Sequence, residues 1–302
     1  MPGLMLLDTP SLYFRAFHGV PESVTAPDGM PVNAVRGLID MIASLVRDHS
    51  PDRLAACMDA DWRPAFRVAA LPSYKAHRVA EGGREQVPDT LSPQLPVIDR
   101  VLDAVGVARI GVPGYEADDV IGTCAAGSSG PVDIVTGDRD LFQLVDDSRP
   151  IRVLYTVKGI RNIQIVDEAA ITDRYGIPGR AYADFAVLRG DPSDGLPGVP
   201  GVGDKTAATL ISAFGSLEGL LAALDGERAE EIPAAARRRL AAARDYLAVA
   251  PTVVRVARDA PVPRADLTLP AAPRDPAALA ELAARYGLDG PVRRLREALQ
   301  AR

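Results

Sequence analysis

The sequence predicts an α/β protein with a mostly parallel central sheet, covered by helices on both faces, followed by a helical region. Apolar runs typical of buried strands recur at residues 4–8, 53–59, 108–112, 132–138, 151–157 and 162–167. Helical patterns, with apolar residues at spacings of three and four, separate the first four runs, as at 32–49 and 95–106. Strands that alternate with helices form parallel sheets buried on both faces.

The second half of the chain predicts a different architecture. Beyond about residue 167 the strand-like runs stop, and short helical patterns follow, separated by glycine and proline. We therefore expect a core over 1–167 and a helical region over 168–302. The alanine-rich end of the chain is expected to be helical and to pack back onto the body.

The distribution of charge bears on the kind of partner. The chain has 34 Lys and Arg against 40 Asp and Glu, a net charge of −6, which taken alone argues against nucleic acid. The basic residues are clustered, however. One cluster lies between Trp62 and Arg84, where Glu81 is the single acid, and another occupies 237–239. The cations of the first cluster are Arg63, Arg67, Lys75, Arg78 and Arg84. Separate acidic and basic clusters suit a protein that holds both cations and a polyanion.

Other classes of protein are disfavoured. The sequence has no run of about 18 uninterrupted apolar residues and no basic segment leading into an apolar stretch near its start. We therefore expect a soluble, cytoplasmic protein with no membrane contact. Cys57 and Cys124 lie in apolar segments without CxxC spacing or a neighbouring histidine, which predicts buried, reduced thiols.

A polar, basic segment broken by Gly-Gly and proline spans residues 73–93. One interpretation is a solvated surface loop. The other is a mobile, cationic segment over a functional site. The sequence alone leaves both open.

Acidic residues gather where the predicted strands end. The carboxyl ends of parallel strands share one crevice, and the acids expected there are Asp8, Asp59, Glu116, Asp118, Asp119, Asp138 and Asp140. Any one of them could simply cap a helix or complement its dipole. Together they raise one another's pKa and destabilise the fold, so cations must compensate.

The type of ligand predicts the type of cation. Oxygen donors without nearby histidine or cysteine suit Mg²⁺ or Mn²⁺ rather than zinc. Two such ions about 4 Å apart activate water and stabilise the charge that develops during in-line attack on a phosphodiester. The stretch YEADDV at 115–120 is therefore interpreted as part of a two-metal site.

The stretch LRGDPSDGLPGVPGVGDKTAATLI adds two features. Asp191 and Asp194 are close enough in sequence to point together from a tight turn. Gly201 and Gly203 then form a Gly-x-Gly turn before a helix, where backbone N–H groups can meet a phosphate without sequence preference. Lys205, in the first turn of that helix, is a sensible phosphate contact.

These motifs together resemble the structure-specific 5′ nuclease family, which includes bacterial 5′–3′ exonucleases, flap endonucleases and the N-terminal domain of DNA polymerase I. The matching stretches occur in the family's order over about 200 residues: LLDTPSLYFRAFH, MDADWRPAFRVAALPSYKAHR, GYEADDVIGT, VTGDRDLFQLV and LRGDPSDGLPGVPGVGDKTA. No polymerase-like segment follows, so the chain is similar to the stand-alone form.

The resemblance implies a PIN-like core and a role for each motif. The inner metal sites would be formed by Asp8, Asp59, Glu116, Asp118, Asp138 and Asp140, and completed, directly or through water, by Asp119, Asp191 and Asp194. A helical arch near 62–95 would pass the single-stranded 5′ end, with Arg67 and Tyr74 contacting DNA.

The resemblance also implies roles for the cations. Lys75 and Arg78 would steady the scissile phosphate, assisted by Arg15. A helix-hairpin-helix-type motif near 190–214 would grip duplex DNA and hold K⁺ through its carbonyls.

The sequence departs from the family's pattern at a few positions. Thr9, Phe14, Arg36 and Gly195 stand where the family usually has other residues. None is an expected metal ligand. Phe14 removes a hydroxyl near DNA, and Gly195 removes a side-chain amide beside Asp194.

The function expected from these residues is cleavage of DNA flaps and duplexes from 5′ ends, leaving 5′-phosphate and 3′-hydroxyl products. By resemblance, the enzyme would act as a monomer in RNA-primer removal and repair. One alternative is a non-catalytic protein that binds branched DNA, although a binder gains nothing from acids that repel phosphate. Another is a PIN-like RNase, although such domains are usually shorter and lack the hairpin after residue 190.

Overall fold

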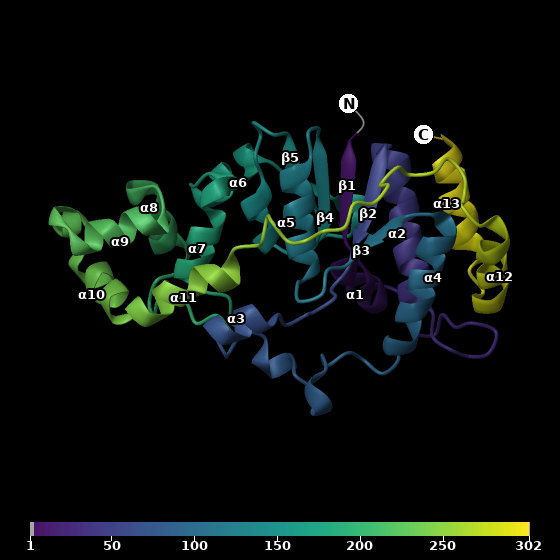
Figure 1. The fold of residues 1–302 in the computed structure, drawn as a ribbon, viewed down its shortest axis with the longest axis horizontal. Coiled ribbons are helices and arrows are strands. Elements are labelled where there is room, and N and C mark those ends of the chain that lie inside the picture. The colour runs from purple at the N-terminus through teal and green to yellow at the C-terminus, as the bar shows by residue number, and fades with distance from the viewer. Residues whose placement is uncertain (1–2, 302) are drawn as a thin grey trace.

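A six-stranded sheet forms the centre of the molecule, as the sequence predicts (Figure 1). The computed structural model describes residues 3–301. The strands are β1 (Leu4–Asp8), β2 (Arg53–Cys57), β3 (Ala108–Ile110), β4 (Val132–Thr136), β5 (Ile151–Tyr155) and β6 (Gln164–Val166). Their order is β3-β2-β1-β4-β5-β6, and all neighbours are parallel except β6, which runs antiparallel to β5.

Both faces of the sheet are buried. Along β1, Leu4 and Leu6 belong to the core on one face, whereas Met5 and Leu7 belong to the core on the other. This is why the strand has a continuous apolar sequence rather than an alternating one. The helices α1 (Thr9–Gly19), α2 (Asn33–His49) and α4 (Leu95–Val105) cover one face, and α5 (Ala117–Gly127) covers the other.

The direction of the crossovers changes beside β1. The chain leaves β1 through α1 and α2 to β2, and then continues through α4 to β3. Helix α5 carries it back to β4, on the other side of β1. In an open α/β sheet, such a change leaves a crevice outside the carboxyl ends of the two strands, which is the usual place for a site.

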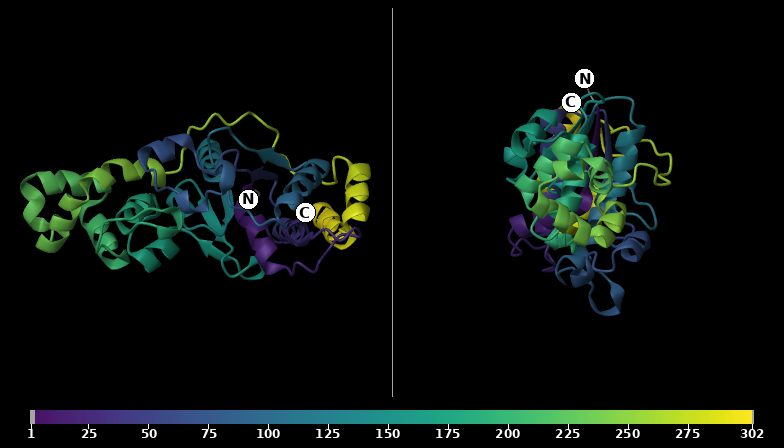
Figure 2. Two further views of the ribbon diagram at one scale, coloured as in Figure 1. Left: turned by 90° about the horizontal axis from the view of Figure 1, so that it is seen from below. Right: turned by 90° about the vertical axis from the view of Figure 1, so that its left-hand side faces the viewer.

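A helical region begins after β6. It comprises α6 (Glu168–Tyr175), α7 (Tyr182–Arg189), α8 (Asp204–Phe214), α9 (Leu217–Asp225), α10 (Ala234–Ala242) and α11 (Arg244–Val254). These helices extend away from the sheet and make the molecule elongated (Figures 1 and 2). Aromatic rings join the two parts, since Phe142, which follows β4, lies 5.4 Å from Tyr182 of α7 between ring centroids.

The end of the chain returns to the sheet. Residues 255–275 cross from α11 to α12 (Pro276–Tyr286), which packs on α4, and α13 (Asp289–Ala301) packs on α2 (Figure 1). Leu279, Leu282, Leu295 and Leu299 join the core on that face. The expectation that the end packs back is therefore confirmed, and the helical region that stands apart ends near residue 254 rather than at 302.

The expected arch is only partly helical. Helix α3 (Ala65–Ala70) is followed by a projecting segment with short 3-10 turns at Ala76–Arg78, Glu81–Gly83 and Ser92–Gln94 (Figure 1). Gly82 and Gly83 adopt positive φ angles of 80° and 79°, which interrupts any helix there.

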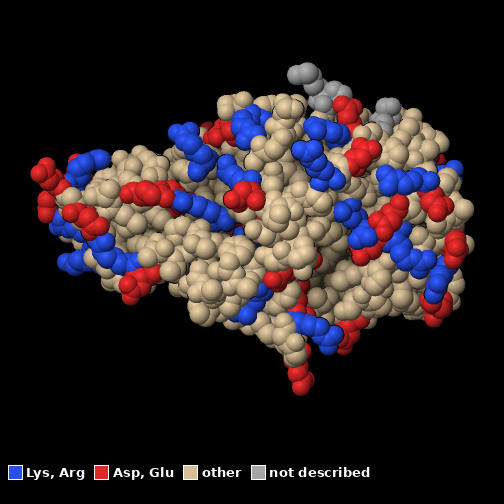
Figure 3. All heavy atoms as spheres, in the orientation of Figure 1, with Lys and Arg blue, Asp and Glu red and all other residues tan. Residues whose placement is uncertain are grey.

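On the face seen in Figure 3, Lys and Arg are interspersed with Asp and Glu rather than gathered in one patch.

Two smaller expectations concern cysteines and membranes. Both cysteines are free; Cys57 is buried and Cys124 partly buried, and burial raises the pKa of both thiols. Within residues 3–301 no single helix is long and apolar enough to cross a membrane. Only α8 and α9 taken together reach that length and composition, and a bend of 78° separates them.

The loop after α7 depends on two glycines that touch. Gly190 and Gly198 have φ angles of 78° and 66°. A Cβ on Gly198 would lie 2.4 Å from the carbonyl oxygen of Arg189, and one on Gly190 would lie 2.5 Å from the nitrogen of Gly198. The close approach closes the loop that carries Asp191 and Asp194.

We expect Gly198→Ala to lower the free energy of unfolding by about 1–3 kcal/mol, because the new methyl group meets backbone and the φ angle is strained. Urea denaturation measures the loss. Gly127→Ala is the control, since a Cβ there has no heavy atom within 4 Å. Equal stability of the two variants would show that the glycine contact is dispensable.

Candidate active site

At the crevice between β1 and β4, the hydroxyl group of Thr136 links Asp8 to Asp138. Asp8 ends β1 and accepts hydrogen bonds from the Thr136 hydroxyl, at 2.6 Å, and from the Ser11 backbone N–H, at 3.2 Å. The same Thr136 oxygen accepts from the backbone N–H of Asp138, at 2.8 Å. Thr136 therefore fixes Asp8 relative to Asp138. We did not predict this role for Thr136. The position of the threonine in VTGD, at the end of the strand and two residues before Asp138, could have indicated it.

Asp140 extends this side of the crevice. Its backbone N–H donates to the Asp138 carboxylate at 2.8 Å, and it begins the 3-10 turn Asp140–Leu144. Burial and then the charges of Asp138, Asp194 and Asp191 raise its pKa well above the ordinary value. Four acids from two distant parts of the sequence therefore act on one another.

The end of β2 and the start of helix α5 supply the opposite side. Asp59, after β2, accepts a 2.7 Å hydrogen bond from the N–H of Ala117, the first residue of α5. An acid is favoured there by the helix dipole. Asp118 follows on α5, and burial, then the charges of Asp8 and Asp138, raise its pKa well above the ordinary value. The acids after β1, β2 and β4 therefore do converge with those of α5.

The raised pKa of Asp8 shows that bringing these carboxylates together in a buried place is energetically unfavourable. Burial is the largest cause that raises its pKa, from 3.8 to about 7; the charges of Asp138 and Asp59 add to it, and the Thr136 hydrogen bond opposes it. A carboxyl group in this state gives up its proton reluctantly unless a cation is near.

The loop after α7 reaches the same place. Asp191 accepts from the Ser193 N–H at 2.9 Å and lies 3.7 Å from Arg189. Asp194 forms an ion pair with Arg78 at 2.6 Å. Burial is the largest cause that raises the pKa of Asp138 and of Asp140, and the charges of Asp191 and Asp194 add to it, so both loop acids act on the crevice.

The basic segment after α3 docks onto these acids. The Lys75 ammonium forms an ion pair and hydrogen bond with Glu116. The Lys75 backbone N–H donates to the Asp194 carbonyl at 2.9 Å, and the Ser73 hydroxyl donates to the Gly195 carbonyl at 2.8 Å. Lys75 has a φ of 47°, which is uncommon for a residue with a side chain. Two of the predicted cations, Lys75 and Arg78, therefore already pair with acids.

Gly195 fits this interface for a steric reason. A Cβ there would lie 2.1 Å from the carbonyl oxygen of Ser73, and its φ is 75°. Glycine at position 195, where the family usually has another residue, therefore allows the loop after α7 to contact the basic segment closely.

Three predicted residues have other roles than expected. Arg67 is 2% exposed and Tyr74 is 4% exposed, so neither side chain lies open at the surface for the expected contact with DNA. The Tyr74 hydroxyl donates to Glu116 at 2.7 Å. Asp119 is fully buried and accepts hydrogen bonds from Arg67, Ala257 and Glu116 on both carboxylate oxygens. Its lone pairs are used, so Asp119 does not bind a metal directly.

Arg15 lies at the rim of the crevice. Its Nη1 donates to the Val157 carbonyl at 3.3 Å, and its Nη2 lies 3.3 Å from the position of a Cβ on Gly137. Its Nε is buried without a hydrogen-bond partner among the described residues. Gly137 directly precedes Asp138, so a donor is free beside the acids.

The predicted hairpin residues lie at the start of α8. Gly201 has a φ of 78°, and its carbonyl accepts from Arg239 at 2.8 Å. Gly203 caps α8 with no side-chain atom nearby, and Lys205 is exposed. A hollow of about 820 Å³ adjoins Lys205 and is also lined by Arg139 and Arg174, two cations that the sequence analysis did not single out.

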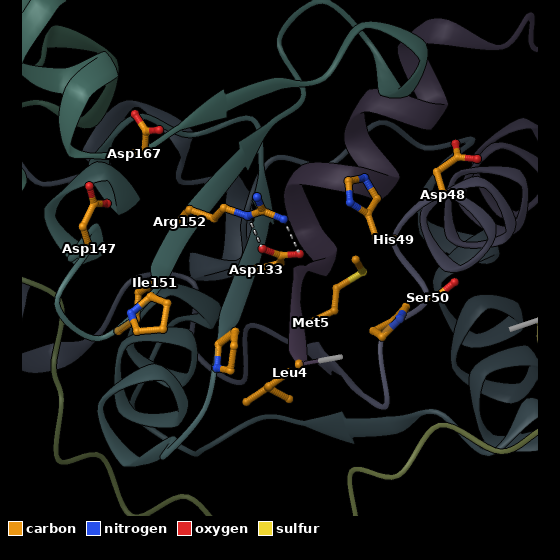
Figure 4. Close-up of a pocket in the computed structure, with 14 residues that line it drawn as sticks. Leu4, Met5, Asp48, His49, Ser50, Asp133, Asp147, Ile151, Arg152 and Asp167 are labelled. Atoms are coloured by element: carbon orange, nitrogen blue, oxygen red, sulfur yellow. Dashed lines mark hydrogen bonds and ion pairs between the residues drawn. The ribbon is translucent and has the colours of Figure 1, made fainter. Parts of the chain in front are cut away.

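A second hollow, of about 750 Å³, lies at the opposite end of the strands and is drawn in Figure 4. Its acids already have structural partners. Asp133 pairs with Arg152 at 2.6 Å, and Asp167 caps α6 by accepting from Ala170 at 2.9 Å. This hollow therefore does not compete with the crevice as the site.

The donor set fits hard divalent cations. It contains carboxylate oxygens only, and the pKa of Asp59 and of Asp138 is raised, first by loss of solvation and then by the charges of neighbouring acids. Within residues 3–301, no three acidic, histidine or cysteine side chains already surround a point closely enough to hold an ion. Lys75 and Arg78 hold Glu116 and Asp194 instead, so these carboxylates would exchange partners on binding ions.

Comparisons with known proteins agree with this geometry. The family model described as 5′-3′ exonuclease, N-terminal resolvase-like domain, matches residues 3–176, and the 5′-3′ exonuclease, C-terminal SAM fold, matches 177–276. A 5′-3′ exonuclease of Streptomyces coelicolor is 65% identical over 88% of this chain and 90% of its own length. DNA polymerase I of Mycobacterium bovis is 43% identical over 75% of this chain and 25% of its own length.

Solved structures show the same fold. A bacteriophage T5 flap endonuclease, crystallised as a pseudo-enzyme-product complex with DNA and metal ions, has a TM-score of 0.62 at 17% identity and covers 99% of this chain and 98% of that one. Sheet and crevice thus define a nuclease with a resolvase-like, PIN-type core. The chain belongs to the 5′-3′ exonuclease family.

The titration of Asp8 yields a prediction on the metal-free protein. Between about pH 4 and pH 7 the folded state keeps a proton on Asp8 that the unfolded state has lost, so stability falls as pH rises through this window. Asp8→Asn removes this titration. We expect the variant to lose less stability over the window and to be more stable than the parent above about pH 7.

Melting temperatures measured with a chelator across this pH range test the expectation. Arg109→Lys, which alters an ion pair with Asp103 on the outer side of β3, is the control and should follow the parent's profile. Parallel profiles for Asp8→Asn and the parent would contradict the account of Asp8.

Proposed function

We propose that the chain is a structure-specific 5′ nuclease that hydrolyses DNA phosphodiesters with two or more divalent cations, Mg²⁺ or Mn²⁺. The observation that carries the proposal is the convergence of acids from β1, β2, β4, α5 and the loop after α7 on one crevice, next to Lys75 and Arg78. Such ions, when bound, generate a nucleophile from water and stabilise charge on the phosphate.

The acids divide into two groups by their partners. Asp8, Asp59, Asp118, Asp138 and Asp140 are the proposed direct ligands, because none of them forms an ion pair within residues 3–301 and the pKa of each is raised. Glu116, Asp191 and Asp194 are proposed to join them, directly or through water, once Lys75 and Arg78 release Glu116 and Asp194.

Release of these carboxylates gives the cations a second role. Lys75 and Arg78 are then free to bind the scissile phosphate, and Arg15, whose Nη2 lies near Gly137, is proposed to assist them. Positive groups that meet a phosphate in a partly buried site stabilise the charge that builds up as the bond breaks. We propose this exchange of partners as the route from the resting to the DNA-bound site.

Duplex DNA is proposed to lie along the helical region. Gly203 leaves the backbone at the start of α8 open, whereas Arg239 lies against Gly201. Lys205, Arg139 and Arg174 line the adjoining hollow. K⁺ at the hairpin is part of the proposal, although the Gly201 carbonyl already accepts a hydrogen bond from Arg239. We further propose a monomer that acts on 5′ flaps and 5′ ends, in the cytoplasm, during primer removal and repair.

The proposal predicts cleavage of end-labelled flap, nicked and blunt duplex DNA, strictly dependent on added Mg²⁺ or Mn²⁺, with 5′-phosphate products. Asp138→Asn should abolish turnover and leave DNA binding nearly intact, because it removes one charge from the crevice and no contact with DNA. Binding without cleavage in the parent protein would favour the non-catalytic alternative. Faster cleavage of an all-RNA flap than a DNA flap would favour the RNase.

We expect Lys75→Ala to lower the single-turnover rate about tenfold or more, because charge stabilisation by the ammonium is lost in the transition state. The matched comparison is Lys205→Ala, which should raise the DNA concentration needed for half-maximal rate and leave the rate at saturation unchanged. Unchanged single-turnover kinetics in Lys75→Ala would exclude the proposed role.

A further inference from the structure

Arg67 is the most buried cation near the crevice, and its guanidinium is fully engaged. It is 2% exposed. Its Nη1 donates to Glu116 at 2.6 Å and to Asp119 at 2.7 Å, and its Nη2 donates to Asp119 at 2.7 Å. Its Nε donates to the Val253 carbonyl at 3.0 Å, and Nη2 also reaches the Arg255 carbonyl at 3.5 Å. These contacts use every N–H of the fork.

Asp119 fixes the other end of this arrangement. One of its carboxylate oxygens accepts from Arg67 and from the Ala257 N–H at 2.8 Å, and the other accepts from Arg67 and from the Glu116 N–H at 3.2 Å. With two donors on each oxygen, the carboxylate has no freedom to rotate. The bidentate Arg67–Asp119 pair is therefore a rigid support rather than an exchangeable ion pair.

The pair joins three elements that are distant in sequence. Arg67 lies on α3, at the base of the basic segment, and Glu116 and Asp119 lie at the start of α5. The Val253 and Arg255 carbonyls lie at the end of α11, the last helix of the helical region. A Cβ on Gly122 of α5 would lie 2.5 Å from the Ala257 carbonyl oxygen, so α5 and the chain leaving α11 are in direct contact.

The charged partners of Glu116 differ between its two oxygens. Arg67 donates to Oε2, whereas Lys75 donates to Oε1. Arg67 is locked by Asp119 and by carbonyls, whereas Lys75 has a more exposed side chain, at 15% against 3%. The buried Tyr74 hydroxyl also donates to both oxygens, at 2.7 Å to Oε2 and 3.0 Å to Oε1. Arg67 and Tyr74 therefore set the orientation of the carboxylate, and Lys75 is its exchangeable partner.

We propose that Arg67 is a positioning residue, which holds Glu116 so that one oxygen faces the divalent-cation site and ties that orientation to the end of α11. The inference rests on the proposed function, because it assigns Glu116 to that site. Arg67 itself touches neither DNA nor an ion. Partners that orient metal ligands typically change metal affinity or activity by 10–100-fold when they are altered.

Arg67→Lys keeps the positive charge but cannot reach both carboxylates and the carbonyls at once. We expect this variant to bind Mn²⁺ about tenfold or more weakly, measured by calorimetry without DNA. The Mn²⁺ concentration for half-maximal cleavage should rise in parallel, with little change in the KM for DNA. Arg152→Lys is the matched control, because Arg152 makes an equivalent fork to Asp133 at the opposite end of the strands.

A second variant keeps the test decisive if Arg67→Lys does not fold. Asp119→Asn leaves the guanidinium in place but weakens its anchor, and should shift Mn²⁺ affinity in the same direction. In a double-mutant cycle with Glu116→Gln, changing Arg67 should have little further effect on Mn²⁺ affinity, because its influence passes through Glu116.

The outcomes separate the two proposals. If the parent protein binds no Mn²⁺ at millimolar concentration, the proposed function fails. If the parent binds Mn²⁺ and folded Arg67→Lys or Asp119→Asn binds it equally well, the role of Arg67 is overturned. Additive effects of Arg67→Lys and Glu116→Gln would likewise overturn it, since they would show that Arg67 acts independently of Glu116.

Discussion

Repulsion among carboxylates is the constraint on which the rest of the structure depends. Acids at the ends of β1, β2 and β4 meet at the point where the crossovers change direction, and burial of Asp8 and Asp118 weakens the screening of their charges by water. The protein compensates in two ways. Arg67 pairs with the fully buried acid Asp119, whereas Lys75 and Arg78 pair with Glu116 and Asp194 through contacts that we propose metal ions replace.

This compensation explains why distant segments lie together. The basic segment after α3 is held against the loop after α7 by ion pairs and by backbone contacts at Lys75 and Gly195. The end of α11 is held against α5 by Arg67 and Asp119. The same charges that would bind ions and phosphate thus also organise the protein when ions are absent, and binding and conformation become coupled.

The sequence predicted those parts of the fold and site that follow from a pattern with a single physical cause. The strands and their parallel arrangement follow from apolar runs alternating with helical periods, and the convergence of the acids follows from where parallel strands end. Residue type was a poor guide to burial: Arg67 and Tyr74 looked like DNA contacts but are enclosed by Asp119 and Glu116. Partners such as the Val253 carbonyl, far away in sequence, leave no local signal. Composition also did not predict where the separate helical region ends. That region ends near residue 254, because α12 and α13 pack against the helices of the sheet.

The most direct test of the account is the position of Mn²⁺ in crystals of the protein soaked with the ion. We predict anomalous peaks in the crevice between the carboxyl ends of β1 and β4, within coordination distance of Asp8, Asp118 and Asp138, with Lys75 displaced from Glu116. An empty crevice at millimolar Mn²⁺, with Lys75 still paired to Glu116, would contradict it.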